Sequence, residues 1–359
     1  MRSAWWTRRV APVPFVPAWS ASRQRPGVSV GAMLRFLVRR AAGYGVLATV
    51  ATALGYVLAS LTLHPAARYA GRTPPVPPSV VHAELAALGV DPGVPVPVRL
   101  WHWLTELVTH GSLGLSVRGV PVTAEIAARA GTSLRLLLIG SLLGALLGVA
   151  VGTWGASRQY RWPDRVTTVG SFVLLATPPF VLAVVLMTLA VRLDSAAGRP
   201  LVPFTGEYTP GLAGGWPAQV GDRAAHLLLP TLCLALGTAA TWSRYQRAAM
   251  LDVLAADHVR TARSMGHTRR SALWRHGVRV ALIPMSTFFA YSFGLILTGA
   301  AITELAFSWH GMGEYLVRSV VDDDVNAAAG TVLFTAVLVL LAGVLADVLH
   351  AALDPRVRT

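Results

Sequence analysis

Residues 244–284 read RYQRAAMLDVLAADHVRTARSMGHTRRSALWRHGVRVALIP, between an apolar run at 224–243 and another that begins at 281. The stretch contains eight arginines. Arginine-rich segments between apolar spans are typical of cytoplasmic loops in membrane proteins. We therefore expect a basic loop between two membrane spans, with a polar helical pattern that can dock a soluble partner. For Arg244 and Arg247 we expect a role in orientation and lipid headgroup contact alone.

The composition is that of a protein embedded in lipid. Hydrophobic residues make up 54% of the chain, charged residues 13%, and the mean hydropathy is +0.54. The net charge of +14 comes from arginines in blocks beside apolar spans, which argues against nucleic-acid binding. The chain contains arginine but no lysine, so it has no lysine for a Walker A loop. Any ATP hydrolysis therefore belongs to another subunit. The single cysteine, Cys233, lies in an apolar run and is read as a small buried hydrophobe.

Six apolar runs are close to the roughly 20 residues that a helix needs to cross a bilayer. The runs are 41–63, 133–154, 166–190, 224–243, 281–304 and 328–350. None alternates strictly between apolar and polar residues, so helices are favoured over a barrel. The sequence predicts an all-α integral membrane protein with six transmembrane helices.

Arginine placement predicts the orientation of the spans. Arginines precede the first span, fill the loop after the second, crowd the loop after the fourth and end the chain, so both termini are expected to be cytoplasmic. We divide the chain into an N-terminal extension (1–32), a first transmembrane helix with a long extracytoplasmic region (33–132), and a transmembrane core (133–358) with a cytoplasmic loop at 244–280. The extension is expected to be disordered, or a start-site artefact with translation beginning at Met33.

The basic loop has the pattern of two helices joined by a turn. Apolar residues within 247–265 recur at the spacing of an amphipathic helix, and Gly266 follows as a left-handed cap. A second short helix is expected to run to about Val280, before Pro284 enters the fifth span.

The segment 257–284, DHVRTARSMGHTRRSALWRHGVRVALIP, resembles the cytoplasmic signature of ABC importer permeases in the dipeptide/oligopeptide/nickel class. Further pieces resemble the same family in the same order: MLRFLVRR at 33–40, GSLGLS at 111–116, PVTAEIAARAGTSL at 121–134, ATPPF at 176–180, LPTLCLALG at 229–237, FSWHGMGEYL at 307–316 and LDPRVR at 353–358. The resemblance therefore covers nearly all of residues 33–358.

This resemblance implies a type I ABC importer permease fold in the cell membrane, and a subunit that carries half of a translocation pathway. The implied partners are a second homologous permease, two cytoplasmic ATPase subunits or domains, an extracytoplasmic solute-binding protein and membrane lipid. A peptide is the expected solute. The residues implied to couple the permease to the ATPases are Asp257, Arg260, Thr261, Ala262, Arg263, Gly266, Arg269, Arg270, Arg275 and His276.

Four other residues are candidates for the translocation pathway. Pro178 and Pro179 either only kink the third span or, with Phe180, help to line a substrate path. Glu304 lies near the end of the fifth span, where an ionisable group is costly unless it faces protein or water, and structural and functional roles are equally open. Asp347 is expected to be a structural partner for an arginine.

Other classes of protein fit less well. A secondary transporter needs a coupling-ion path, and the spans offer few acids and no clear inverted repeat. A permease for a non-peptide solute such as nickel is a further alternative. No catalytic constellation and no histidine spacing such as HExxH is present, so neither an enzyme, a bound metal nor a cofactor is expected.

Overall fold

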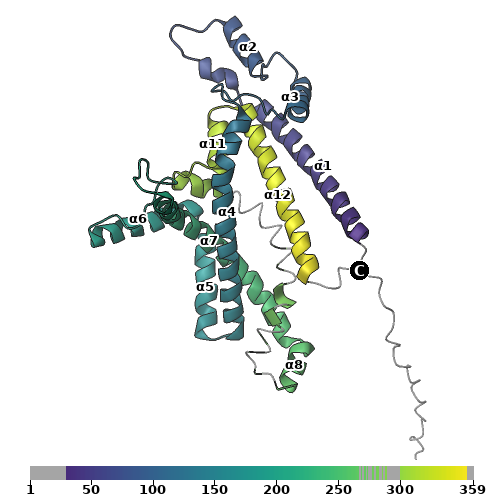
Figure 1. Ribbon diagram of the computed structural model, residues 1–359, viewed down its shortest axis with the longest axis vertical. Coiled ribbons are helices and arrows are strands. Elements are labelled where there is room, and N and C mark those ends of the chain that lie inside the picture. The colour runs from purple at the N-terminus through teal and green to yellow at the C-terminus, as the bar shows by residue number, and fades with distance from the viewer. Residues whose placement is uncertain are drawn as a thin grey trace, which may run out of the picture.

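The structure, a computed structural model, describes residues 30–266 and 300–353, together with scattered positions between 268 and 288. Helices account for nearly all of the secondary structure in this part of the chain (Figure 1). They are α1 (Val30–Thr62), a 3-10 turn (Pro65–Tyr69), α2 (Pro78–Ala87), α3 (Val96–His110), α4 (Val122–Ser157), α5 (Trp162–Ala176), α6 (Pro179–Ala197), α7 (Trp216–Ala255), α8 (Asp257–Ser264), α11 (Met312–Val321) and α12 (Val325–Leu353).

Five of the described helices are long and apolar enough to cross a membrane: α1, α4, α6, α7 and α12. The prediction of an all-α integral membrane protein is thereby confirmed. Most of the fifth predicted run, 281–304, lies outside the described residues. The count of six spans and the cytoplasmic placement of both termini therefore stay predictions, as does the reading of residues 1–32, of which 1–29 are outside the described part.

The third predicted run, 166–190, is not one helix. Helix α5 ends at Ala176, Thr177 is extended with φ −85° and ψ 118°, and α6 begins at Pro179. Proline disfavours the helical conformation in the residue before it. Pro178 therefore favours an extended Thr177, and Pro179 favours an extended Pro178. Pro179 then occupies the first turn of α6, where its missing N–H costs nothing. Figure 1 shows α6 lying across the direction of α4 and α5.

Helices α4 and α7 form the centre of the molecule, and a row of glycines brings their backbones together. A Cβ at Gly148 would lie 2.4 Å from the Trp242 Cβ, and a Cβ at Gly152 would lie 2.4 Å from the Ser243 carbonyl oxygen. The row, with one glycine at every fourth position, is Gly140, Gly144, Gly148 and Gly152. Small residues at this spacing allow close helix contact where lipid supplies no hydrophobic drive.

Helices α1 and α12 pack side by side (Figure 1). Near the N-terminal end of α1, the Arg40 Nε lies 2.7 Å from Asp347 Oδ2 on α12, and the Tyr44 hydroxyl is also close to this carboxylate. The expectation that Asp347 pairs with an arginine is confirmed.

The region between α1 and α4 folds over the opposite end of this helix pair. Buried Tyr56 of α1, Trp103 of α3 and Val325 of α12 belong to one apolar cluster. Asn326 at the start of α12 donates to the carbonyls of Leu88 and Leu115, at 2.8 and 2.9 Å. Helices α2 and α3 are therefore fixed to the core at the end where α11 and α12 meet (Figure 1).

Candidate functional site

The predicted coupling segment begins with a change of helix direction. Helix α7 ends at Ala255, Ala256 is extended with ψ 147°, and α8 starts at Asp257. The prediction of one amphipathic helix over 247–265 is therefore wrong, because 247–255 belong to the end of a membrane-spanning helix. A carboxylate is favoured in the first turn of a helix, which suits Asp257 to beginning a new one.

One face of α8 is packed against the core. Val259 is 4% exposed and joins a buried cluster with Met250 and Val253 of α7 and Ala156 at the end of α4. Leu273, Val278 and Ala281 belong to the same cluster. On the other side, Asp257 and Thr261 are exposed. Helix α8 thus rests on the end of α7, in an apolar cluster that also includes Ala156 at the end of α4, and presents a polar face outward.

Gly266 ends this segment in the left-handed region, with φ +90°, as predicted. A Cβ there would have open space around it, so the backbone angle alone favours glycine. The side chains of Arg260, Ala262 and Arg263 lie outside the described residues. So do the remaining predicted coupling residues, Arg269, Arg270, Arg275 and His276.

A buried ion pair fixes the start of α5 to α7 beside this segment. Arg247 Nε and Nη2 lie 2.6 and 2.9 Å from the two carboxylate oxygens of Asp164, which is 3% exposed. Hydrogen bonding to Arg247 and to the Tyr160 N–H lowers the pKa of Asp164. Arg244 lies over the ring of Phe172, with its Cζ 4.5 Å from the centroid. The expectation of orientation and lipid contact alone is therefore wrong for Arg247, which is paired with a buried carboxylate. For Arg244, which is exposed, it stays a prediction.

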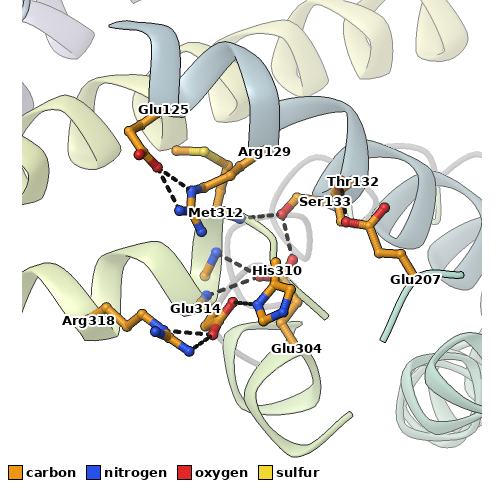
Figure 2. A network of polar contacts seen from close by, with 11 residues as sticks. Glu125, Arg129, Thr132, Ser133, Glu207, Glu304, His310, Met312, Glu314 and Arg318 are labelled. Carbon is orange, nitrogen blue, oxygen red and sulfur yellow. Dashed lines mark hydrogen bonds and ion pairs between the residues drawn. The ribbon is translucent and has the colours of Figure 1, made fainter. Parts of the chain in front are cut away.

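Glu304, a predicted pathway residue, is 1% exposed and lies at a junction of three elements. It accepts hydrogen bonds from the Ser133 hydroxyl at 2.5 Å and from the N–H groups of Gly313 and Glu314 at 2.8 and 3.1 Å (Figure 2). A Cβ at Gly311 would come within 2.5 Å of the Glu304 carboxyl. Of the two roles left open, the geometry supports the structural one.

Ser133 has a part in this junction that its residue type alone does not signal. Its hydroxyl donates to Glu304 and accepts from the Met312 N–H at 2.7 Å, which joins α4 to the start of α11 (Figure 2). On α11 the Glu314 carboxylate is 3% exposed and pairs with Arg318, while His310 Nδ1 lies 2.8 Å from it. The buried Glu314 carboxylate is thus paired with Arg318 at this end of the protein.

The other pathway candidates lie elsewhere. Pro178, Pro179 and Phe180 are exposed at the break between α5 and α6, and Phe180 is 55% exposed. The Pro179 carbonyl faces α7, at 3.6 Å from Cys233 Sγ. Glu304 points instead toward α4 and α11, so the structure does not gather the four predicted residues into one site. Cys233 is buried at 3% exposure, as expected.

A pocket lined by both charged and apolar side chains lies near this junction, and no pattern in the sequence indicates it. Its volume is about 190 Å³ and it is lined by Arg135, Glu207, Arg223, Ala224, Leu227 and Trp309. Arg135 pairs with Glu207 at 2.9 Å, and Glu207 also accepts from the Thr132 hydroxyl at 2.9 Å. The two partners of the ion pair are 72 residues apart in sequence, so no local motif could have shown it.

Together these features define a multi-pass helical membrane protein whose spans are joined by glycine contacts and buried polar groups. The family described as "Binding-protein-dependent transport system inner membrane component" matches residues 132–359, and the chain belongs to this family. The resemblance to ABC importer permeases of the dipeptide/oligopeptide/nickel class is confirmed, as is the placement in the cell membrane.

The matches to known relatives cover between 72 and 91% of the chain. The oligopeptide transport system permease protein OppB of Mycobacterium tuberculosis (strain ATCC 25618 / H37Rv) is 48% identical over 326 residues, which cover 91% of this chain and 99% of OppB. The glutathione transport system permease protein GsiC of Pectobacterium atrosepticum is 33% identical over 333 residues, covering 91% and 99%. The oligopeptide transport system permease protein AppB of Bacillus subtilis is 33% identical over 263 residues, covering 72% and 80%.

Proposed function

We propose that this chain is the permease subunit of an ATP-binding cassette importer and forms half of the pathway for peptides. A second homologous permease supplies the other half, two cytoplasmic ATPases supply the energy, and an extracytoplasmic solute-binding protein delivers the peptide. ATP hydrolysis belongs to those separate subunits, since the lysine-free sequence cannot form a Walker A loop. The names of the relatives, which refer to oligopeptides and glutathione, support a peptide over nickel.

The observation that carries this proposal is that α8 packs on the end of α7, in one apolar cluster with the end of α4. Helix α7 has 40 residues and α4 has 36, so they extend for about 60 and 54 Å at 1.5 Å per residue. The glycine row, from Gly140 to Gly152, holds the two helices together over about 18 Å of this length. A displacement of α8 is therefore transmitted to two packed spans rather than absorbed by a flexible loop.

We assign the docking surface to the exposed face of α8 and to the segment after Gly266. ATP-driven closure of the two ATPases would press on α8 and shift the spans between inward-open and outward-open states. In this assignment the domains are a first span with its extracytoplasmic region at 33–132, and the permease core at 133–358. The loop at 244–280 then lies on the cytoplasmic side.

The test is the substitution Gly266→Leu in the assembled importer, reconstituted in liposomes with its ATPases and binding protein. At φ +90° a leucine is strained, so the direction of the chain after α8 changes. We expect peptide uptake driven by ATP to fall to background while insertion into the membrane is normal.

The matched control is Gly198→Leu. Gly198 also has a left-handed backbone, with φ +64°, and open space around it, but it ends α6. Uptake should survive in this variant. Normal uptake in Gly266→Leu, or equal losses in both variants, would refute the placement of the coupling segment. Uptake that persists without ATP would favour the secondary transporter.

A further inference from the structure

Helix α3 has an apolar stripe that remains exposed in the described part of the protein. The side chains of Val98, Trp101 and Val108 are 44, 67 and 82% exposed. Residues three and seven positions apart lie on the same side of a helix, so these side chains form one row. The opposite face is packed, with Arg99 and Trp103 only 9 and 6% exposed.

The position of α3 beside α1 gives the depth of this stripe. The ring centroids of Trp103 and Tyr56 are 5.3 Å apart, and the apolar span of α1 runs from Arg39 to Thr62. Tyr56 is six residues before Thr62, or about 9 Å along the helix axis. Helix α3 therefore lies beside the last turns of a membrane span rather than beyond its end (Figure 1).

The side chains of α1 at this level have the exposure expected of a lipid-facing surface. Leu58 and Leu61 are 62 and 65% exposed. Large apolar groups that are exposed next to a span are stabilised by hydrocarbon and destabilised by water. An outward-facing row on α3 at the same depth meets the same environment.

The polar residues of α3 are segregated from the stripe. His102, Glu106 and His110 are exposed along one flank, and Glu106 pairs with His110 at 3.2 Å. Thr105 lies among the apolar residues, but its hydroxyl donates to the carbonyls of Trp101 and His102, at 3.0 and 2.8 Å. That hydroxyl needs no water, so the stripe as a whole can leave the aqueous phase.

We propose that Val98, Trp101 and Val108 lie in the lipid leaflet at the C-terminal end of α1, with His102, Glu106 and His110 turned toward water. An amphipathic helix in the plane of the interface, with tryptophan on its apolar side, has this arrangement. Helix α3 then sets the depth at which the region between α1 and α4 meets the membrane. The inference depends on α1 as a membrane span and is independent of the coupling to ATPases.

The test uses spin labels on single introduced cysteines in the full-length protein in lipid nanodiscs. Trp101→Cys and Val108→Cys place labels on the stripe, and His102→Cys and His110→Cys place controls on the polar flank of the same helix. The native Cys233 is buried, and the unsubstituted protein taken through the same labelling gives the background. Collision with oxygen, which concentrates in lipid, is compared with collision with a water-soluble nickel chelate.

We expect the ratio of oxygen to nickel collisions to be several-fold higher at 101 and 108 than at 102 and 110. Nickel collisions as frequent on the stripe as on the flank would overturn the proposal. Nickel collisions on the stripe that disappear only when a solute-binding protein is added would also overturn it, and would identify that protein as the partner. Because no transport is measured, this result is separate from the outcome at Gly266.

Discussion

At the scale of single residues, Glu304 shows how a charge can be held inside a membrane protein. Its carboxylate accepts from one hydroxyl and two backbone N–H groups, contributed by α4 and α11. If the carboxylate is removed, the two N–H groups of α11 lose their acceptor, and each buried unpaired donor costs about 1–3 kcal/mol. Glu304 thus stabilises the contact of α11 with α4 and with the helical residues that precede Glu304.

We predict that Glu304→Ala lowers the melting temperature of the purified protein by several degrees. Glu106→Ala is the control, because Glu106 is 59% exposed and its pair with His110 is worth little in water. Melting is followed by intrinsic fluorescence in one detergent. Equal melting temperatures for the two variants would show that Glu304 is not a structural anchor.

The ion pair of Asp164 and Arg247 predicts a dependence of stability on pH. Folding lowers the pKa of Asp164, so the pair stabilises the protein above the ordinary aspartate pKa of about 4. This stabilisation is lost as the pH falls through the lower pKa of the folded state. Asp164→Asn should therefore be less stable than the parent protein at pH 7, by about 1.5–3 kcal/mol, the usual range for hydrogen bonds to charged groups, since Asp164 is buried but Arg247 is partly exposed.

The difference between the two proteins should shrink as the pH is lowered from 5 toward 3. The measurement is the melting temperature of both across this range. Asp322→Asn, which removes the exposed partner of Arg118, is the control and should have little effect at any pH. A difference that stays constant at all pH values would argue against a charged, paired Asp164.

At the scale of helices, the glycine row of α4 makes a direct prediction. A Cβ at Gly148 would lie 2.4 Å from the Trp242 Cβ and 3.0 Å from the Ala239 carbonyl oxygen. Gly148→Ala should therefore force α4 and α7 apart and cost about 1–3 kcal/mol, the usual range for overpacking. Gly131→Ala is on the same helix with open space around it and should be neutral or stabilising. Thermal stability of the two variants gives the comparison, and equal effects would contradict the proposed contact.

Sequence patterns located the helices but not all of their ends. The runs predicted at 133–154 and 224–243 lie inside α4 and α7, which extend well beyond them. Hydropathy detects the part of a helix that is in lipid, whereas polar turns outside the bilayer continue the same hydrogen bonding. The break at Thr177 was signalled by two prolines, but periodicity could not distinguish a kink from a full interruption.

The site was predictable only where its signal is local. Gly266 was identified from its place after a helical stretch, and its φ of +90° agrees. Ser133, the partner of Glu304, is 171 residues away from it in sequence, and Asp164, the partner of Arg247, is 83 residues away. These contacts therefore depend on how the helices assemble. No short motif or residue spacing in the sequence indicates that arrangement.

At the scale of the whole molecule, the proposed coupling segment is joined to the membrane core through packing. Val259 places α8 on the end of α7, in one cluster with the end of α4, and α4 and α7 pack on each other along the glycine row. At the other end, Asn326 at the start of α12 donates to the carbonyls of Leu88 and Leu115, in the segments that follow α2 and α3. A force applied at α8 therefore acts on a continuous set of packed helices.

The most direct test of this account is cross-linking from Thr261, which lies on the exposed face of α8. A cysteine introduced by Thr261→Cys in the assembled importer, treated with a short thiol-to-amine reagent, should join the permease to an ATPase subunit. The same reagent applied to Thr109→Cys should give no such product; Thr109 is an exposed residue of α3. A cross-link from position 261 to the solute-binding protein, or labelling of 261 by a membrane-impermeant reagent added outside intact cells, would contradict the account.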